Sequence, residues 1–145
     1  AFFEENAIEE TVTPQGSITT RAGNGITIHQ GDVFDLTPEI VGPIDWTFDR
    51  GALIALPPEI RARYAPHIAR LTGADKEILL VHVEYDQSLM SGPPYSVPVE
   101  ELRRLFEGHD LTLLHEAPAL SPDSPFRQAG LTWLTERVWR IRLAD

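Results

Sequence analysis

Apolar positions along the chain follow two periods, which predict different elements. Over residues 57–71, Ile60 and Tyr64 lie four positions apart with charged residues between them, so this stretch is predicted to form an amphipathic helix. Pro66 lies inside the stretch and should kink the helix or end its first part. Residues 77–85, EILLVHVEY, are apolar almost throughout and have strand length, which is expected of a strand buried on both faces.

Another apolar stretch, residues 44–56, reads IDWTFDRGALIAL and combines a strand with the start of a helix. Its first half places apolar residues between β-formers, which predicts a buried strand. Asp49 and Arg50 follow where that strand ends, and Gly51 lets the backbone turn. Ligands of open α/β sheets bind outside the carboxyl ends of the strands, so this strand end is a candidate site.

The amino-terminal third contains a predicted hairpin. Asn24-Gly25 separates two runs of β-formers within residues 17–30, and this dipeptide is a strong hairpin signal. We expect residues 1–10 to belong to a helix and residues 11–17 to form a loop. The other predicted elements are a helix start at Thr37-Pro38, a short helix over residues 98–107, a proline-rich loop over residues 117–125, and strands over residues 111–115 and 131–143.

Strands and helices alternate after the hairpin, and this order predicts an α/β fold with parallel strands. The last two strands have no predicted helix between them, so we expect them to pair antiparallel at the edge of the sheet. A chain of 145 residues is long enough for one domain with its own core, and we expect a single domain over residues 1–145.

Composition narrows the classes of partner. The chain has 22 acidic and 12 basic residues and a formal net charge of −10, so we expect no binding to nucleic acid or to anionic membranes. Cysteine is absent, which excludes disulfides and thiolate metal sites and favours a cytoplasmic protein. No apolar run has the length of a membrane span, and the first residues lack the features of a signal peptide.

Three stretches carry a family resemblance: DRGALIALPPEIRARY, YDQSLMSGPPYSVPVEELRRLF and FRQAGLTWLTERVWRI. Together they resemble thiopurine S-methyltransferase and its bacterial relatives, in the family's order and over nearly the whole chain. The resemblance implies a class I methyltransferase, with a Rossmann-like, mostly parallel sheet and one antiparallel strand near its edge. It also implies S-adenosylmethionine as cofactor and S-methylation of small aromatic or heterocyclic thiols. We further expect the protein to be a monomer.

The cofactor signature with which this family begins has no counterpart here. The chain enters the family pattern at AFFEEN, after the first strand, glycine loop, helix and second strand. Its Gly23-Asn24-Gly25 lies in the predicted hairpin turn, so we do not interpret it as a nucleotide-binding loop. We therefore expect the protein to continue upstream of Ala1, because strands that lack central neighbours expose apolar faces and backbone edges.

Asp32, Val33 and Arg50 are the candidate cofactor residues. The resemblance implies that Asp32 and Val33 lie at the adenine edge, where a carboxylate accepts hydrogen bonds and an apolar side chain packs on the ring. Without the resemblance, Gly31-Asp32 is typical of a turn. Arg50 is implied in both cofactor and substrate binding, and its alternative is a structural pair with Asp49 or with another acid.

Arg127 is the second candidate substrate-binding residue, and its alternative is a solvated loop arginine. Tyr85, Asp86 and the Gly92-Pro93-Pro94 stretch form the next strand end and loop, which can close over a substrate or simply connect two elements. His82, Glu84 and Asp86 alternate along one strand face, but the surrounding residues are apolar, so we expect no metal site there.

The expected chemistry requires no catalytic base. The sulfonium methyl is already electrophilic and an aromatic thiol is partly ionised near neutral pH, so positioning and a nearby cation are sufficient. Two alternatives remain open at this point. One is a halide, thiol, selenium or tellurium methyltransferase with a similar fold, and the other is a non-catalytic methyltransferase-like binding module.

Overall fold

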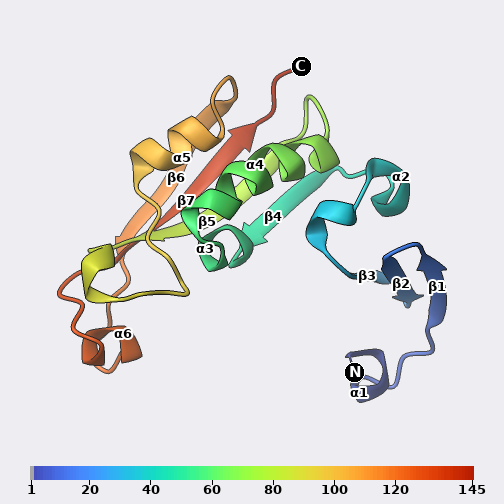
Figure 1. Cartoon of the computed structure of the whole chain (residues 1–145), viewed down its shortest axis with the longest axis horizontal. Helices are drawn as coiled ribbons and strands as arrows, with labels where there is room; N and C mark the ends of the chain where they lie inside the picture. The colour runs from blue at the N-terminus through green and yellow to red at the C-terminus, as the bar shows by residue number, and fades with distance from the viewer. Residues whose placement is uncertain (1) are drawn as a thin grey trace. The chain divides into compact units, whose positions relative to one another are not determined.

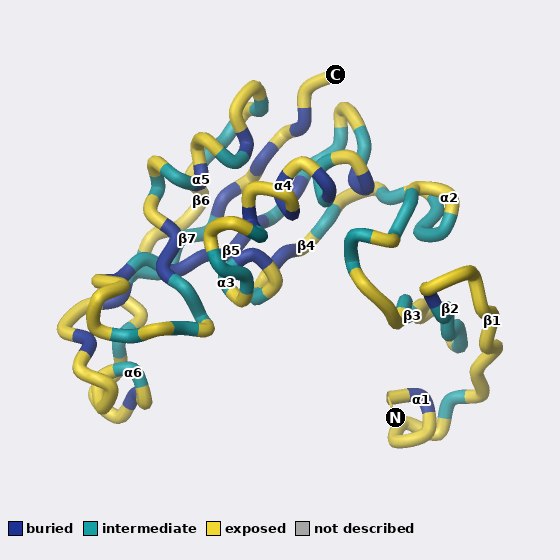
Figure 2. Tube along the Cα trace, in the orientation of Figure 1, coloured by how far each residue is buried: buried dark blue, intermediate teal, exposed yellow. Residues whose placement is uncertain are grey.

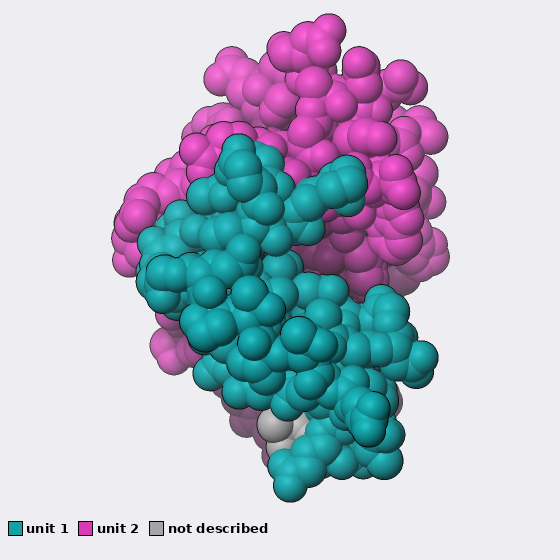
Figure 3. Space-filling model, turned by 90° about the vertical axis from the view of Figure 1, so that its right-hand side faces the viewer, with its two compact units in different colours: residues 1–43 teal, residues 44–145 magenta. Residues whose placement is uncertain are grey.

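The computed structural model describes residues 2–145. The chain divides into two compact units, residues 1–43 and residues 44–145 (Figure 3). Within residues 2–145, no helix is both long and apolar enough to cross a lipid bilayer.

The first unit is built around a three-stranded antiparallel sheet in the order β1-β2-β3. Asn24 and Gly25 form the two-residue turn between β2 and β3 with φ values of 49° and 76°, as a type I′ turn requires, and confirm the predicted hairpin. The elements are α1 (Phe2–Glu5), β1 (Thr11–Gln15), β2 (Ile18–Gly23), β3 (Ile26–Gln30), the 3₁₀ turn η1 (Val33–Asp35) and α2 (Pro38–Val41).

Two expectations for this unit are wrong. The predicted loop over residues 11–17 is largely strand β1, which pairs with β2 and is exposed along its length (Figure 2). Pro14 is compatible with β1 because an edge strand has N–H groups that need no partner. The predicted helix over residues 1–10 is only the short α1, and residue 1 lies outside the described part.

The second unit has a four-stranded sheet in the order β4-β5-β7-β6. Strand β4 is parallel to β5, whereas β7 is antiparallel to both β5 and β6. The elements are β4 (Trp46–Arg50), α3 (Ala52–Ala55), α4 (Pro58–Thr72), β5 (Glu77–Glu84), η2 (Gln87–Leu89), α5 (Val99–Leu105), β6 (Asp110–Pro118), α6 (Pro125–Gln128) and β7 (Thr135–Arg142).

The fold is α/β, but the expected mostly parallel sheet is not confirmed. Among the described strands, β4 and β5 form the one parallel pair, and the whole first sheet is antiparallel. The predicted antiparallel pairing of the last two strands is present between β6 and β7. Their connection contains the short helix α6, which directly follows the predicted loop over residues 117–125 and was not itself predicted, and α4 continues through Pro66.

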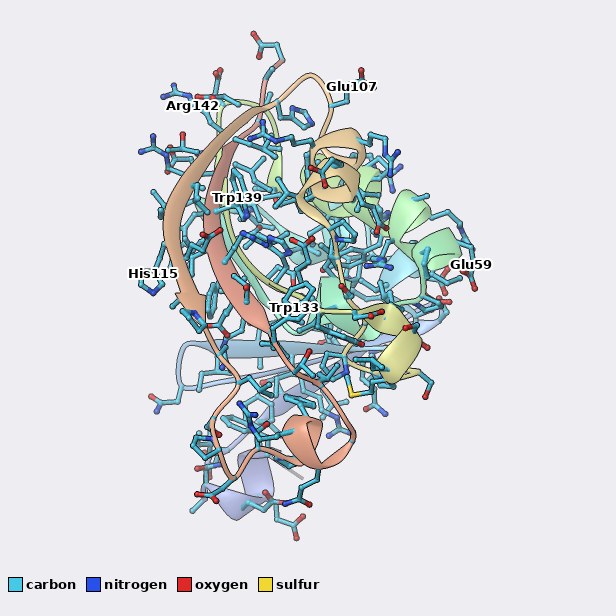
Figure 4. All side chains as sticks on the ribbon, turned by 90° about the vertical axis from the view of Figure 1, so that its left-hand side faces the viewer. Glu59, Glu107, His115, Trp133, Trp139 and Arg142 are labelled. Carbon is cyan, nitrogen blue, oxygen red and sulfur yellow. The ribbon has the colours of Figure 1, made fainter. Side chains whose placement is uncertain are left out.

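Helices α3, α4 and α5 lie against one face of the second sheet (Figure 1). The core forms on that face, from Ile78 and Leu80 of β5, Ile141 of β7, and Leu102 and Phe106 at α5, all of them buried. Figure 4 shows Trp139 on the helix side of β7 and His115 on the opposite side of the sheet. The predicted burial of β5 is confirmed along most of its length.

The opposite face of this sheet is open, and the expectation of a fully buried strand over residues 44–48 is wrong. Strand β4 has β5 as its one neighbour among the described strands, and Trp46 and Phe48 point away from the helices with 62% and 53% of their surfaces exposed. A hollow of about 360 Å³ on this face is lined by Trp46, Glu77, Leu79, Leu114 and Arg140.

Candidate functional site

The carboxyl end of β4 is held by the side chain of Asp49. Its Oδ1 accepts hydrogen bonds from the backbone N–H groups of Ala52 (3.1 Å) and Leu53 (3.3 Å) at the start of α3. Its Oδ2 accepts a hydrogen bond from the hydroxyl of Tyr64 on α4 (3.0 Å). Gly51, between strand and helix, has a φ of 119°, which residues that have a Cβ atom rarely adopt. The turn is therefore fixed by both its backbone and its cap.

The Asp49 carboxylate is buried, with 3% of the residue exposed. Burial raises the pKa of Asp49, while the N–H of Leu53, the Tyr64 hydroxyl and the N–H of Ala52 act in the opposite direction by donating to the charged form. Burial and the Asp49 charge both raise the pKa of Tyr64, which therefore remains a hydrogen-bond donor. The acid at this strand end is thus a structural cap that needs its three donors.

Arg50 is exposed at the end of β4, on the sheet face opposite the Asp49 side chain. Within residues 2–145, no hydrogen bond or salt bridge engages its guanidinium group, and the predicted alternative of a pair with Asp49 is not what the structure contains. Arg50 lies in register with Val81 of β5. Its five N–H donors are therefore available to an anion or a polar ligand.

The segment after β5, residues 86–97, is bonded to the neighbouring elements at several points. The backbone N–H of Val97 donates to the carbonyl of Val83 (2.9 Å), and that of Tyr95 donates to the carbonyl of Ile54 on α3 (2.6 Å). Arg61, which is 1% exposed on α4, donates through Nη1 to the carbonyl of Ser96 (3.0 Å). The predicted loop over Gly92-Pro93-Pro94 is thus tied to α3, α4 and β5.

An apolar cluster joins the segments that carry the two candidate arginines. Ile54 comes four residues after Arg50, and Phe126 directly precedes Arg127. Both pack against the same buried group at the carboxyl end of β5. The buried members are Val83, Tyr85, Leu131 and Leu134, and the partly buried residues packed on them are Ile54, Met90, Leu120 and Phe126.

Arg127 lies on α6, a short helix whose first turn is capped by Ser124, since Ser124 Oγ accepts from the N–H of Phe126 (3.2 Å). Its side chain is exposed. The structure therefore brings the segments of Arg50 and Arg127 to one cluster, and residues 125–128 are helical.

Asp32 and Val33 lie in the first unit, at the start of η1. Asp32 is exposed, and its Oδ1 accepts from the N–H of Phe34 (3.0 Å), so the predicted turn geometry is present. Val33 is partly buried beside it. An exposed carboxylate next to a partly buried apolar side chain fits the polar edge and the flat face of an adenine ring, because the second carboxylate oxygen can still accept hydrogen bonds.

His82, Glu84 and Asp86 have separate roles. His82 Nδ1 lies 2.9 Å from the carbonyl of Val97, and His82 Nε2 accepts from the indole N–H of Trp139 (2.9 Å). Glu84 is bonded to Arg137, and Asp86 caps η2. No group of three potential metal ligands occurs among the described residues. Sequence reasoning missed Tyr64 and Gln87, whose partners become visible only in three dimensions.

Known proteins of one family match this chain over nearly its whole length. The family model described as Thiopurine S-methyltransferase (TPMT) matches residues 1–144. A thiopurine S-methyltransferase of Xanthobacter autotrophicus is 51% identical over 144 residues, which is 98% of this chain and 64% of that protein. One of Methylococcus capsulatus is 41% identical over 143 residues, which is 97% of this chain and 64% of that protein. The chain therefore spans just under two thirds of these relatives.

Solved structures with a similar fold are S-adenosylmethionine methyltransferases. An arsenic(III) S-adenosylmethionine methyltransferase from Chlamydomonas reinhardtii superposes with a TM-score of 0.57 at 17% identity, over 80% of this chain and 44% of that one. A SAM-dependent methyltransferase from Methanosarcina mazei gives a TM-score of 0.51 at 10% identity, over 79% of this chain and 66% of that one. At such identities the likeness concerns the fold alone.

Proposed function

Because this chain belongs to the thiopurine S-methyltransferase family, we propose that the protein transfers a methyl group from S-adenosylmethionine to the sulfur of a small aromatic or heterocyclic thiol. The observation that carries the proposal is the exposed, unpaired guanidinium of Arg50 on a turn fixed by Asp49. An unengaged arginine on a rigid turn at a strand end is suited to binding an anion or a polar ligand.

Asp32, Val33 and Arg50 are the proposed cofactor-binding residues. The Asp32 carboxylate is exposed and can accept from the amino group of an adenine, and the partly buried Val33 can pack against the ring. Bound S-adenosylmethionine supplies an electrophilic methyl group on its sulfonium. The residues of this chain are then required to bind, orient and shield the reactants.

Arg50 and Arg127 are the proposed acceptor-binding residues. A guanidinium beside the acceptor favours the thiolate over the thiol, which increases the fraction of nucleophile without a catalytic base. The apolar cluster at the carboxyl end of β5 would exclude water and accommodate a flat aromatic ring. Rate acceleration then comes from holding the sulfur in line with the methyl group.

The proposal also covers the domain organisation, oligomeric state and location of the protein. We propose that residues 1–145 belong to one methyltransferase domain, and that the protein acts as a monomer in the cytoplasm without nucleic acid. The net charge of −10 supports the last point, because such a surface repels phosphate backbones.

The proposal is tested by kinetics of Arg50→Ala. Loss of a charge-assisted hydrogen bond to the acceptor should lower kcat/KM for an aromatic thiol about 10- to 100-fold. The free energy of unfolding should change by less than about 0.5 kcal/mol, because Arg50 is exposed. Arg104→Ala, a change at an exposed arginine of α5, is the matched control and should leave kcat/KM unaltered. Wild-type kinetics in Arg50→Ala would refute the assignment.

A further inference from the structure

One exposed side chain, Gln87, bonds to three separate points around the segment that follows β5. Its Oε1 accepts from the backbone N–H of Ser96 (2.8 Å). Its Nε2 donates to the carbonyl of Met90 (2.5 Å) and to the hydroxyl of Tyr85 (3.1 Å). The amide group therefore uses its acceptor and its donors at once, and it bridges the beginning, middle and end of residues 86–97.

The groups that Gln87 contacts are themselves connected. Tyr85 donates through its hydroxyl to the carbonyl of Pro94 (2.6 Å). Ser96 Oγ accepts from the N–H of Tyr85 (3.0 Å) and lies 2.8 Å from the Tyr85 carbonyl, to which it donates. Removing the Gln87 amide therefore leaves the two ends of the segment attached, but removes the bonds to the Met90 carbonyl, the Tyr85 hydroxyl and the N–H of Ser96.

The segment contributes one side chain, that of Met90, to the apolar cluster at the proposed acceptor site. Met90 packs on the apolar cluster that also includes Ile54 and Phe126. The ring of Tyr95 lies against Gly92 so closely that a Cβ on this glycine would come within 2.6 Å of Tyr95 Cδ1. Gln87 thus holds the backbone at the carbonyl of Met90 and at the N–H of Ser96, directly after Tyr95.

We propose that Gln87 is a positioning residue for the acceptor site, which keeps Met90 in place as part of a preformed wall against which the thiol binds. This inference rests on the proposed function. Gln87 acts through the segment over residues 86–97 and has no direct role in methyl transfer.

The position of Gln87 distinguishes this role from a general contribution to stability. Gln87 and Ser91 on the same segment are both exposed. Water therefore competes for the hydrogen bonds of the Gln87 side chain, and these bonds contribute little to the free energy of unfolding of the whole protein. Without the Gln87 amide, the segment becomes ordered only when the acceptor binds. The entropic cost of this ordering makes the binding free energy of the acceptor less favourable. The affinity for the cofactor is not affected in the same way.

The test compares Gln87→Ala and Gln87→Glu with Ser91→Ala in the full protein. Both Gln87 variants should raise KM for an aromatic thiol about tenfold, since neither can donate to the carbonyl of Met90. The Kd for S-adenosylmethionine and the melting temperature should stay unchanged. Cleavage by chymotrypsin after Leu89 or Met90 should become faster in both. Ser91→Ala should match the unsubstituted protein, because no side-chain bond of Ser91 occurs in the described structure.

An unchanged KM in Gln87→Ala, measured beside an active unsubstituted protein, would overturn this inference alone. An equal rise in KM for the thiol and Kd for S-adenosylmethionine, with a lower melting temperature, would also overturn it, because that is the result of general loosening. Absence of methyl transfer in the unsubstituted protein would overturn the proposed function itself and the acceptor role with it.

Discussion

At the scale of single residues, the site depends on which neighbour each charged side chain engages. The sequence predicts that Asp49 and Arg50 lie at a strand end, but it leaves open whether they pair with each other. Strand alternation sends them to opposite faces, and the nearby α4 supplies Tyr64 as the donor for the acid. The pairing was unpredictable because Tyr64 is fifteen positions away in sequence, and only the packing of α4 on the sheet brings it close.

His82 gives a residue-scale prediction about pH. Burial lowers its pKa from 6.5 to about 4, with Arg137 acting in the same direction and the Val97 carbonyl opposing. Between pH 6.5 and about 4, the His82 imidazole is protonated in the unfolded chain and neutral in the folded protein. The free energy of unfolding therefore falls as the pH falls. The loss should amount to about 3 kcal/mol over this window.

Urea unfolding at several pH values checks the role of His82. The decrease in the free energy of unfolding between pH 6.5 and about 4 that is due to His82 should disappear in His82→Gln. It should persist in His115→Gln, because His115 is exposed on the other side of the sheet (Figure 4). Equal slopes for the unsubstituted protein and His82→Gln would show that the buried imidazole does not control acid stability.

At the scale of elements, local sequence patterns correctly predict those helices, strands and turns that do not depend on pairing with distant strands. The Asn24-Gly25 hairpin, α4 and β5 follow from turn chemistry and periodicity. Strand β1 was missed because its TVTPQ sequence contains Pro14 and is exposed on both sides, so it has no alternating apolar pattern. The burial of residues 44–48 was overestimated because apolar residues indicate a strand without saying how many neighbours it has.

The turn between β4 and α3 gives an element-scale prediction. Tyr64→Phe removes a donor from the buried Asp49 carboxylate, so the free energy of unfolding should fall by about 1–3 kcal/mol. The acceptor KM should also rise, because the same turn carries Arg50. Urea denaturation and steady-state kinetics measure the two effects. Tyr95→Phe is the matched control for the stability measurement alone, since no hydrogen bond of the Tyr95 hydroxyl occurs in the described structure. A fully stable Tyr64→Phe would contradict the capping role.

At the scale of the whole molecule, the family was predictable because three motifs occur in the family's order, and the match over residues 1–144 agrees with them. The direction of strands was harder to predict. Alternation of strands and helices favours parallel pairing, but β7 returns beside β5 in the opposite direction and the first sheet is antiparallel throughout. The open sheet face around Trp46 and Phe48 also follows from pairing and is not visible in the local sequence.

The most direct measurement of the central claim is transfer of an isotopically labelled methyl group from S-adenosylmethionine by the purified, unsubstituted protein. The acceptors are a heterocyclic thiol such as a thiopurine, and its oxygen analogue. The account predicts label on the sulfur of the thiol and none on the oxygen analogue, because the proposed site stabilises a thiolate without a base to deprotonate a hydroxyl. Absence of label on the thiol, or equal labelling of the oxygen analogue, would contradict it.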